Sequence, residues 1–130
     1  MIGIDTNILV RFLAQDHAEQ SLRADALLQT LSAQEPGFVS LVSLIELAWV
    51  MRSRYHVSKS DLIQSLEGLL NSPELVIESQ PAVTQAIKRF GEAKADFTDC
   101  LIERSGHSAG CKHTFTFDVN AAKTAGMKLL

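Results

Sequence analysis

Four acidic residues are placed where they could do chemistry: Asp5, Glu46, Asp99 and Asp118. Carboxylates that gather at one site repel one another, which raises their pKa values unless a cation is bound. A set of oxygen ligands without histidine favours hard divalent ions over zinc. The four acids therefore predict a Mg²⁺ or Mn²⁺ site of the kind that activates water for attack on a phosphodiester.

Three of these acids also have an ordinary structural interpretation. Asp5 and Asp118 each precede a segment with helical character, so either side chain could simply cap a helix N-terminus. Asp99 could be a first-turn acid favoured by the helix dipole, with Asp96 as the N-cap. Taken singly, each acid fits the structural interpretation as well as the catalytic one.

Glu46 is different because it lies in the middle of an apolar stretch, residues 44–51. The surrounding segment, 42–54, is apolar on nearly every side, which predicts a buried helix. A buried and unpaired glutamate is costly, so such residues are usually paired, protonated or bound to a metal. We therefore expect Glu46 to be buried and functional.

Strand and helix patterns alternate along the whole chain. Strands are expected at 1–4, 38–40, 74–77, 113–117 and 127–130, and helices at 7–13, 18–31, 42–54, 58–70, 81–92, 96–105 and 119–125. This order predicts an α/β fold, a Rossmann-like three-layer α/β/α sandwich with a central parallel sheet of about five strands. Asp5 and Asp118 then follow the carboxyl ends of strands, where functional crevices of such sheets lie.

Composition narrows the class of protein. The chain has 130 residues, 46% of them hydrophobic, which fits a single domain over 1–130. The apolar runs are too short and too interrupted by charge for a membrane span or signal peptide. Two cysteines are too few for a disulfide scaffold, so we expect a cytoplasmic protein. The net charge of -3 predicts no large basic surface. The four candidate acids account for the excess of acidic over basic residues, because without them 11 acidic residues face 12 basic ones.

Four segments together resemble the motifs of a known family. They read IDTNIL at 4–9, SLIEL at 43–47, ADFTDCLI at 95–102 and TFD at 116–118. In this order they resemble the PIN-domain nucleases, and within them the small VapC-type toxins of bacterial toxin-antitoxin pairs. The similarity extends over nearly the entire chain, including the closing residues 125–130.

The resemblance implies a metal-dependent endoribonuclease. It implies that Asp5, Glu46 and Asp99 hold Mg²⁺ or Mn²⁺ for RNA hydrolysis, with Asp118 as a fourth, more variable acid. Polar positions of the motifs would line the site around the metal ligands, namely Thr6, Asn7 and Thr116. Of these, Asn7 and Thr116 would orient the ligands or metal-bound water. Asn120 stands where many relatives place another acid, which leaves a second metal position open.

The resemblance also implies partners. It implies an RNA substrate, a homodimer, and a VapB-type antitoxin that inhibits the site and carries the DNA-binding function. Arg11 is the first candidate for an RNA phosphate contact, because it follows the first motif on the adjoining helix.

Two other functions compete with this interpretation. One is a catalytically silent α/β binding module or a receiver-like signalling module, but we find no matching pair of a strand-end acid and a later lysine. The other is a haloacid-dehalogenase-like phosphatase, which needs a second acid two residues after Asp5, where Asn7 stands.

Overall fold

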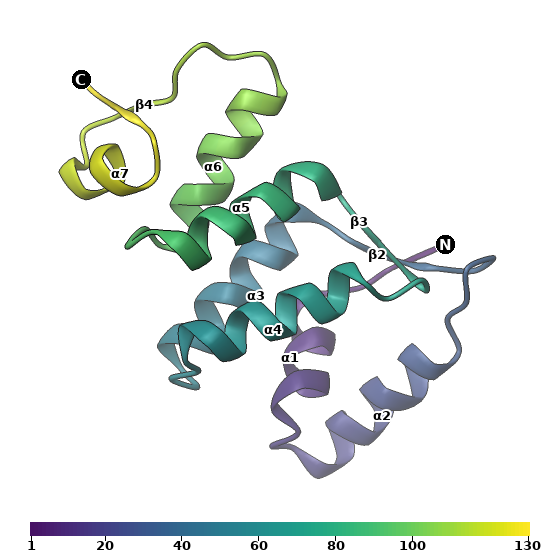
Figure 1. Cartoon of the computed structure of the whole chain (residues 1–130). Helices are drawn as coiled ribbons and strands as arrows, with labels where there is room; N and C mark the ends of the chain where they lie inside the picture. The colour runs from purple at the N-terminus through teal and green to yellow at the C-terminus, as the bar shows by residue number, and fades with distance from the viewer. The chain divides into compact units, whose positions relative to one another are not determined.

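The computed structural model describes all residues of the chain, 1–130, and resolves two compact units, Met1–Glu78 and Ser79–Leu130 (Figure 1). The first is called unit 1 and the second unit 2. Each has its own strands and helices and is described by itself. The expectation of a single domain over 1–130 stays a prediction.

Unit 1 contains a three-stranded parallel sheet with helical crossovers. Strands run in the order β1-β2-β3, with Gly3 opposite Phe38 and Phe38 opposite Val76. The elements are β1 (Ile2–Gly3), α1 (Thr6–Ala14), α2 (Ala18–Gln29), β2 (Gly37–Val39), α3 (Leu41–Ser53), α4 (Lys59–Leu70) and β3 (Leu75–Ile77). Every expected strand and helix of this region is present, with ends within a few residues of the predicted ones.

The core of unit 1 forms where these helices meet. Helix α1 packs against α2 and α3, α3 packs against α4, and α4 packs against β3. The largest fully buried side chains include Leu9, Leu44, Leu47, Leu62 and Leu66. Each such leucine contributes about 1.5–3 kcal/mol through its removal from water. These contacts fix α1, which follows Asp5, and α3, which carries Glu46.

Gly37 begins β2 at a point where the neighbouring side chains leave no room. A Cβ atom at this position would lie 2.9 Å from Ile4 Cγ1 and 2.9 Å from Leu31 Cδ1. Glycine therefore allows Ile4 to pack directly over the sheet. Since Ile4 immediately precedes Asp5, this close packing fixes the start of the first motif.

Unit 2 is built on a helix pair. The elements are α5 (Gln80–Glu92), α6 (Phe97–Ser108), β4 (Phe115–Thr116), α7 (Val119–Thr124) and β5 (Lys128–Leu129). Helices α5 and α6 pack together, and Phe90 meets Phe97 edge to face with ring centroids 6.0 Å apart. Strands β4 and β5 pair in parallel, with Phe115 opposite Lys128.

The α/β class with parallel strands is confirmed. The five strands form two sheets, one of three strands and one of two, where the sequence pattern suggests one central sheet. Each strand is only two or three residues long, so hydrogen-bonded ladders are short and the sequence pattern does not determine their grouping. No helix combines the length and apolar character that crossing a membrane requires.

Candidate active site

Asp5 occupies the N-cap position of α1 but does not cap it. Its backbone has the extended cap conformation, φ -77° and ψ 156°, yet its side chain accepts no cap hydrogen bond. The carboxylate is exposed. The interpretation of Asp5 as a helix cap is therefore wrong. The Asp5 carboxylate is not used to satisfy the N-terminus of α1.

Glu46 is exposed, so the prediction that it is buried is wrong. Helix α3 buries only one stripe, formed by Leu44, Leu47, Ala48 and Met51. The opposite face is open even where it is apolar: Val42 is 74% exposed and Trp49 58%. Apolar composition around the whole helix suggested complete burial, whereas packing uses one face only.

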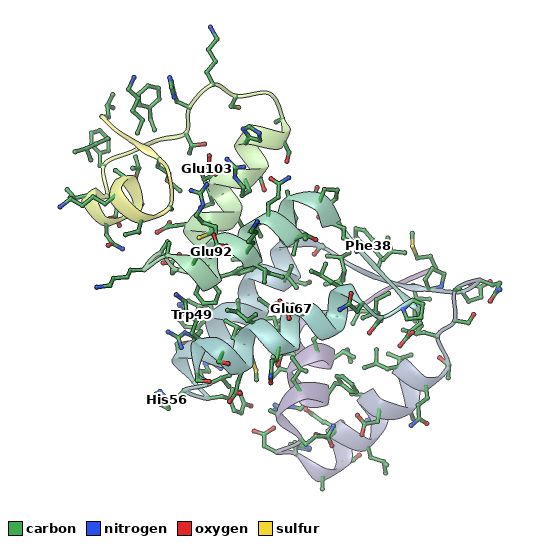
Figure 2. All side chains as sticks on the ribbon, in the orientation of Figure 1. Phe38, Trp49, His56, Glu67, Glu92 and Glu103 are labelled. Atoms are coloured by element: carbon green, nitrogen blue, oxygen red, sulfur yellow. The ribbon has the colours of Figure 1, made fainter.

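The exposed face of α3 places Glu46 between two large apolar side chains. Val42, Glu46 and Trp49 are four and three residues apart, which puts them on one side of a helix. Figure 2 labels Trp49 on α3, with His56 just beyond the end of the helix. The fold forms no hydrogen bond or ion pair with the Glu46 carboxylate, so Glu46 is also left for another use.

The polar residues of the first motif lie in different surroundings. Asn7 is exposed on α1, close in sequence to Asp5, while Thr6 is buried with 3% exposure. Arg11 follows one helical turn after Asn7 and is partly buried. The roles predicted for these three residues stay predictions, and burial makes Thr6 part of the unit 1 core as well.

In unit 2, Asp96 and Asp99 form the start of α6. Asp96 is the N-cap, and its Oδ1 accepts a hydrogen bond of 2.7 Å from the Asp99 backbone N–H. This cap was predicted from the sequence and is confirmed. Asp99 itself is half-buried in the first turn of the helix.

Asp118 caps α7, as one interpretation of the sequence predicts. Its Oδ1 accepts from the Ala121 backbone N–H at 3.0 Å. The Asp118 backbone N–H in turn donates to Thr116 Oγ1, also at 3.0 Å. Thr116 therefore fixes the loop that presents Asp118, and the second carboxylate oxygen of Asp118 is not used by the cap.

Electrostatics connect the acids of unit 2. Burial of the carboxyl raises the pKa of Asp99, and the negative charges of Asp96 and Asp118 raise it further. A cation beside Asp99 would offset these effects. No group of three or more His, Cys, Asp or Glu side chains in the structure is placed closely enough to hold a metal ion. The four-acid ligand set stays a prediction.

Comparison with known families decides the classification. The sequence matches the PIN domain family over residues 2–127. The chain belongs to the PIN domain family. A relative in Aquifex aeolicus (strain VF5), a VapC ribonuclease, is 27% identical over 115 residues, which cover 88% of this chain and 84% of the relative.

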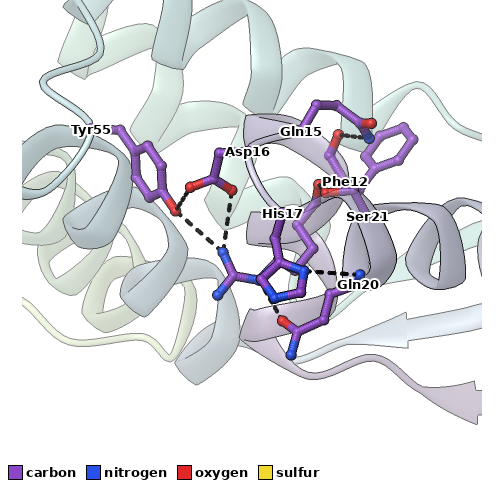
Figure 3. A network of polar contacts seen from close by, with 8 residues as sticks. Phe12, Gln15, Asp16, His17, Gln20, Ser21 and Tyr55 are labelled. Carbon is purple, nitrogen blue, oxygen red and sulfur yellow. Dashed lines mark hydrogen bonds and ion pairs between the residues drawn. The ribbon is translucent and has the colours of Figure 1, made fainter.

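This PIN domain also has a polar network that sequence reasoning missed (Figure 3). Tyr55 Oη donates to Asp16 Oδ2 at 2.8 Å, and Arg11 Nη1 lies 3.2 Å from Asp16 Oδ1. Arg11 Nε donates to Gln20 Oε1 at 2.7 Å. The Tyr55 hydrogen bond, with Arg11 beside it, lowers the pKa of the Asp16 carboxyl. Tyr55 and Asp16 are 39 residues apart, so no local pattern reveals the pair.

A second missed residue of this PIN domain is Glu78. Its Oε1 accepts from the Leu41 backbone N–H at 2.8 Å, while Ser40 Oγ accepts from the Ser43 N–H at 3.1 Å. Two acceptors therefore satisfy the N-terminus of α3, the helix that carries Glu46. Ser40 carries a recognisable N-cap signal in the sequence, whereas Glu78 is brought to α3 by the pairing of β2 with β3.

Proposed function

We propose that this chain is a Mg²⁺- or Mn²⁺-dependent endoribonuclease and the toxin of a toxin-antitoxin pair. Membership of the PIN domain family and likeness to a VapC ribonuclease support this function. The observation that carries the proposal is that the fold uses neither of the two candidate acids in unit 1, Asp5 and Glu46. Asp5 stands at a cap position without capping, and Glu46 is exposed without a partner.

The proposed metal ligands are Asp5, Glu46, Asp99 and Asp118. All their donor atoms are carboxylate oxygens, which suit Mg²⁺ or Mn²⁺. Asp118 keeps one oxygen outside its cap, and a cation would relieve the crowding of charge around Asp99. A bound divalent ion would supply a Lewis acid that stabilises charge developing on a phosphodiester during hydrolysis.

The supporting residues have distinct proposed tasks. Thr116 holds the turn that presents Asp118 through its bond to the Asp118 N–H. Asn7 is exposed on the first turn of α1 and is proposed to orient substrate or water beside Asp5. Thr6 supports the same turn from within the core of unit 1.

Partners follow from the same proposal. The substrate is RNA, the inhibitor is a VapB-type antitoxin, and DNA is contacted only through that antitoxin. A homodimer is proposed because Trp49, one turn beyond Glu46 toward the carboxyl end of α3, leaves apolar surface open on that helix. Sedimentation velocity of wild type and Trp49→Ala tests the dimer: a weaker dimer is expected in the variant, and a wild type that stays monomeric contradicts it.

The proposed activity is tested by incubating purified protein with a pool of structured RNAs in Mg²⁺ or Mn²⁺. Discrete cleavage products are expected with either metal and none in EDTA. Asp5→Asn, prepared identically, should be inactive although folded. Absence of cleavage under every metal by a folded protein would contradict the proposal and favour a silent α/β binding module.

A further inference from the structure

A groove runs between α1 and α2 on unit 1 and begins beside the first motif. Its volume is about 590 Å³. The lining on α1 consists of Asn7, Ile8 and Arg11. The lining on α2 consists of Gln20, Arg23, Ala24 and Leu27. None of these residues is acidic, and two of them are arginines.

The order of residues along α1 connects the groove to Asp5. Asn7 lies two residues after Asp5, and Arg11 lies four residues after Asn7 on the same helix face. The rise of an α-helix is about 1.5 Å per residue, so Asn7 and Arg11 are about 6 Å apart along the axis. The groove therefore extends along α1 from the end nearest Asp5 toward Arg11.

Arg11 is held in place before any ligand arrives. Its Nε bonds Gln20, and its Nη1 lies 3.2 Å from Asp16 Oδ1 and 3.4 Å from Tyr55 Oη. None of these bonds uses Nη2. Figure 3 shows Tyr55 and Asp16 directed toward each other, with Gln20 close by. A guanidinium fixed in this way loses little conformational freedom when it contacts a phosphate.

Arg23 complements Arg11 from the facing helix. Its side chain is 78% exposed, and its ion pair is with Glu19 one turn earlier, at 3.9 Å. Exposed pairs of this kind contribute little and are screened by salt, so the Arg23 guanidinium can move to a phosphate at small cost. Ile8, Ala24 and Leu27 provide an apolar floor on which a ribose or base can rest.

A second cavity of unit 1 has the opposite character. It has a volume of about 370 Å³ and is lined by four apolar side chains, three neutral polar ones and the two acids Asp25 and Glu74. Its acids would repel phosphates, whereas the lining of the α1–α2 groove includes two arginines and no acid. The carboxylates paired with these arginines, Asp16 and Glu19, lie outside the lining. The contrast in lining charge favours the α1–α2 groove as a path for nucleic acid.

We propose that the α1–α2 groove binds the RNA backbone adjacent to the scissile phosphate, with Arg11 and Arg23 each contacting one phosphate. The inference rests on the proposed nuclease function, and it deepens that function by naming where the substrate strand runs. Arg23 can present its planar fork to a phosphate through two parallel hydrogen bonds, whereas Arg11 has only Nη2 free for such a contact. Arg23 is the residue to test, because Arg11 also holds Asp16 and Tyr55 in place.

The binding test uses fluorescein-labelled single-stranded RNA of mixed sequence in EDTA, so that cleavage cannot interfere. Anisotropy titrations over a series of KCl concentrations compare wild type, Arg23→Gln, Arg23→Lys and Arg54→Gln. Arg54 is an exposed arginine of unit 1 outside the groove, which makes it the matched control for loss of one charge. Circular dichroism verifies that each variant is folded.

Each phosphate contact to single-stranded RNA contributes about 0.7 to the slope of log K against log salt concentration. Arg23→Gln should therefore reduce the magnitude of the slope by about 0.7, while Arg23→Lys and Arg54→Gln retain the wild-type slope. In cleavage assays with Mn²⁺, Arg23→Gln should raise KM and leave kcat within about twofold.

The outcomes distinguish a failure of the proposed RNA-binding groove from a failure of the proposed nuclease activity. A reduced slope in Arg23→Gln without any cleavage by wild type supports the groove and contradicts the nuclease. If wild type cleaves RNA but Arg23→Gln has the same salt slope and KM as Arg54→Gln, the proposal that the groove binds RNA is overturned. The groove would then bind another ligand, such as an acidic peptide. Failure of wild type to bind the RNA at all contradicts both proposals.

Discussion

Helices α4 and α6 begin with the same local arrangement and differ in what surrounds it. In α4 the Ser58 Oγ accepts from the Asp61 N–H at 3.1 Å, and in α6 the Asp96 Oδ1 accepts from the Asp99 N–H at 2.7 Å. Both helices therefore have a capped N-terminus and an acid at the third position. The α4 cap is a neutral hydroxyl, whereas the α6 cap is itself an acid.

The difference shows where capping stops being a sufficient explanation. Asp61 is an exposed first-turn acid, and the helix dipole favours its charge. Asp99 is half-buried beside Asp96 and Asp118, so its ionised form is disfavoured and its pKa is raised. Stability alone does not account for an acid in that position, and this supports the proposed metal-binding role of Asp99.

The largest expected effect comes from replacing each third-position acid, Asp99 in α6 and Asp61 in α4, by asparagine. Asp99→Asn should lower kcat/KM for RNA cleavage by more than about 100-fold, because a metal ligand supports several kcal/mol of transition-state stabilisation. Asp61→Asn should stay within about twofold of wild type. Initial-rate assays with Mn²⁺ measure both variants. Equal losses in the two variants would remove the distinction between α4 and α6.

The caps themselves provide the next test. Removing a side-chain cap costs about 1 kcal/mol of stability, so Ser58→Ala and Asp96→Ala should lower the melting temperature by a few degrees. Asp96→Ser should retain the α6 cap while it removes one negative charge near Asp99, so it should be at least as stable as wild type. Differential scanning calorimetry measures all three. A stability loss in Asp96→Ser as large as in Asp96→Ala would refute this separation of cap from charge.

Asp118 allows cap and catalysis to be separated at α7. Asn caps a helix about as well as Asp, so Asp118→Asn should retain stability, whereas Asp118→Ala should lose about 1 kcal/mol. Both variants should lose cleavage if the charge of Asp118 is needed for the metal. Urea unfolding and cleavage assays on the same preparations check this. If Asp118→Asn retains cleavage activity, Asp118 serves only as the cap of α7.

The smallest effect is a difference in pH dependence between Asp99 and Asp16. Because its pKa is raised, ionised Asp99 destabilises the metal-free protein at neutral pH, and Asp99→Asn should be more stable than wild type there. This gain in stability should disappear at acidic pH, where Asp99 is protonated. Asp16 has a lowered pKa, so Asp16→Asn should be less stable at neutral pH, with the loss disappearing in acid. Melting curves of both variants and wild type in EDTA, from neutral to acidic pH, should therefore converge from opposite sides. Parallel curves would contradict the assigned causes.

Local signals in the sequence were enough for the elements and for two of the caps. Asp96 and Asp118 cap α6 and α7, and the strand and helix ranges agree with prediction within a few residues. These features depend on residues close together in the chain, for which period and capping chemistry are reliable.

Features that depend on tertiary packing were not predicted. The exposure of Glu46 depends on which face of α3 packs, and an apolar sequence around the whole helix does not specify that face. The contacts of Arg11 with Asp16 and Tyr55, and the cap that Glu78 gives α3, join residues brought together only by the fold. Long-range polar pairs of this kind leave no periodic pattern.

Direct measurement of metal binding tests the central claim, that Asp99 belongs to a divalent-ion site. Electron paramagnetic resonance of free Mn²⁺ titrated with wild type, Asp99→Asn and Asp61→Asn reports the bound fraction without RNA. Wild type and Asp61→Asn should bind Mn²⁺ alike, and Asp99→Asn should bind at least about 10-fold more weakly. Equal Mn²⁺ binding by Asp99→Asn and Asp61→Asn, or none by wild type, would contradict the claim.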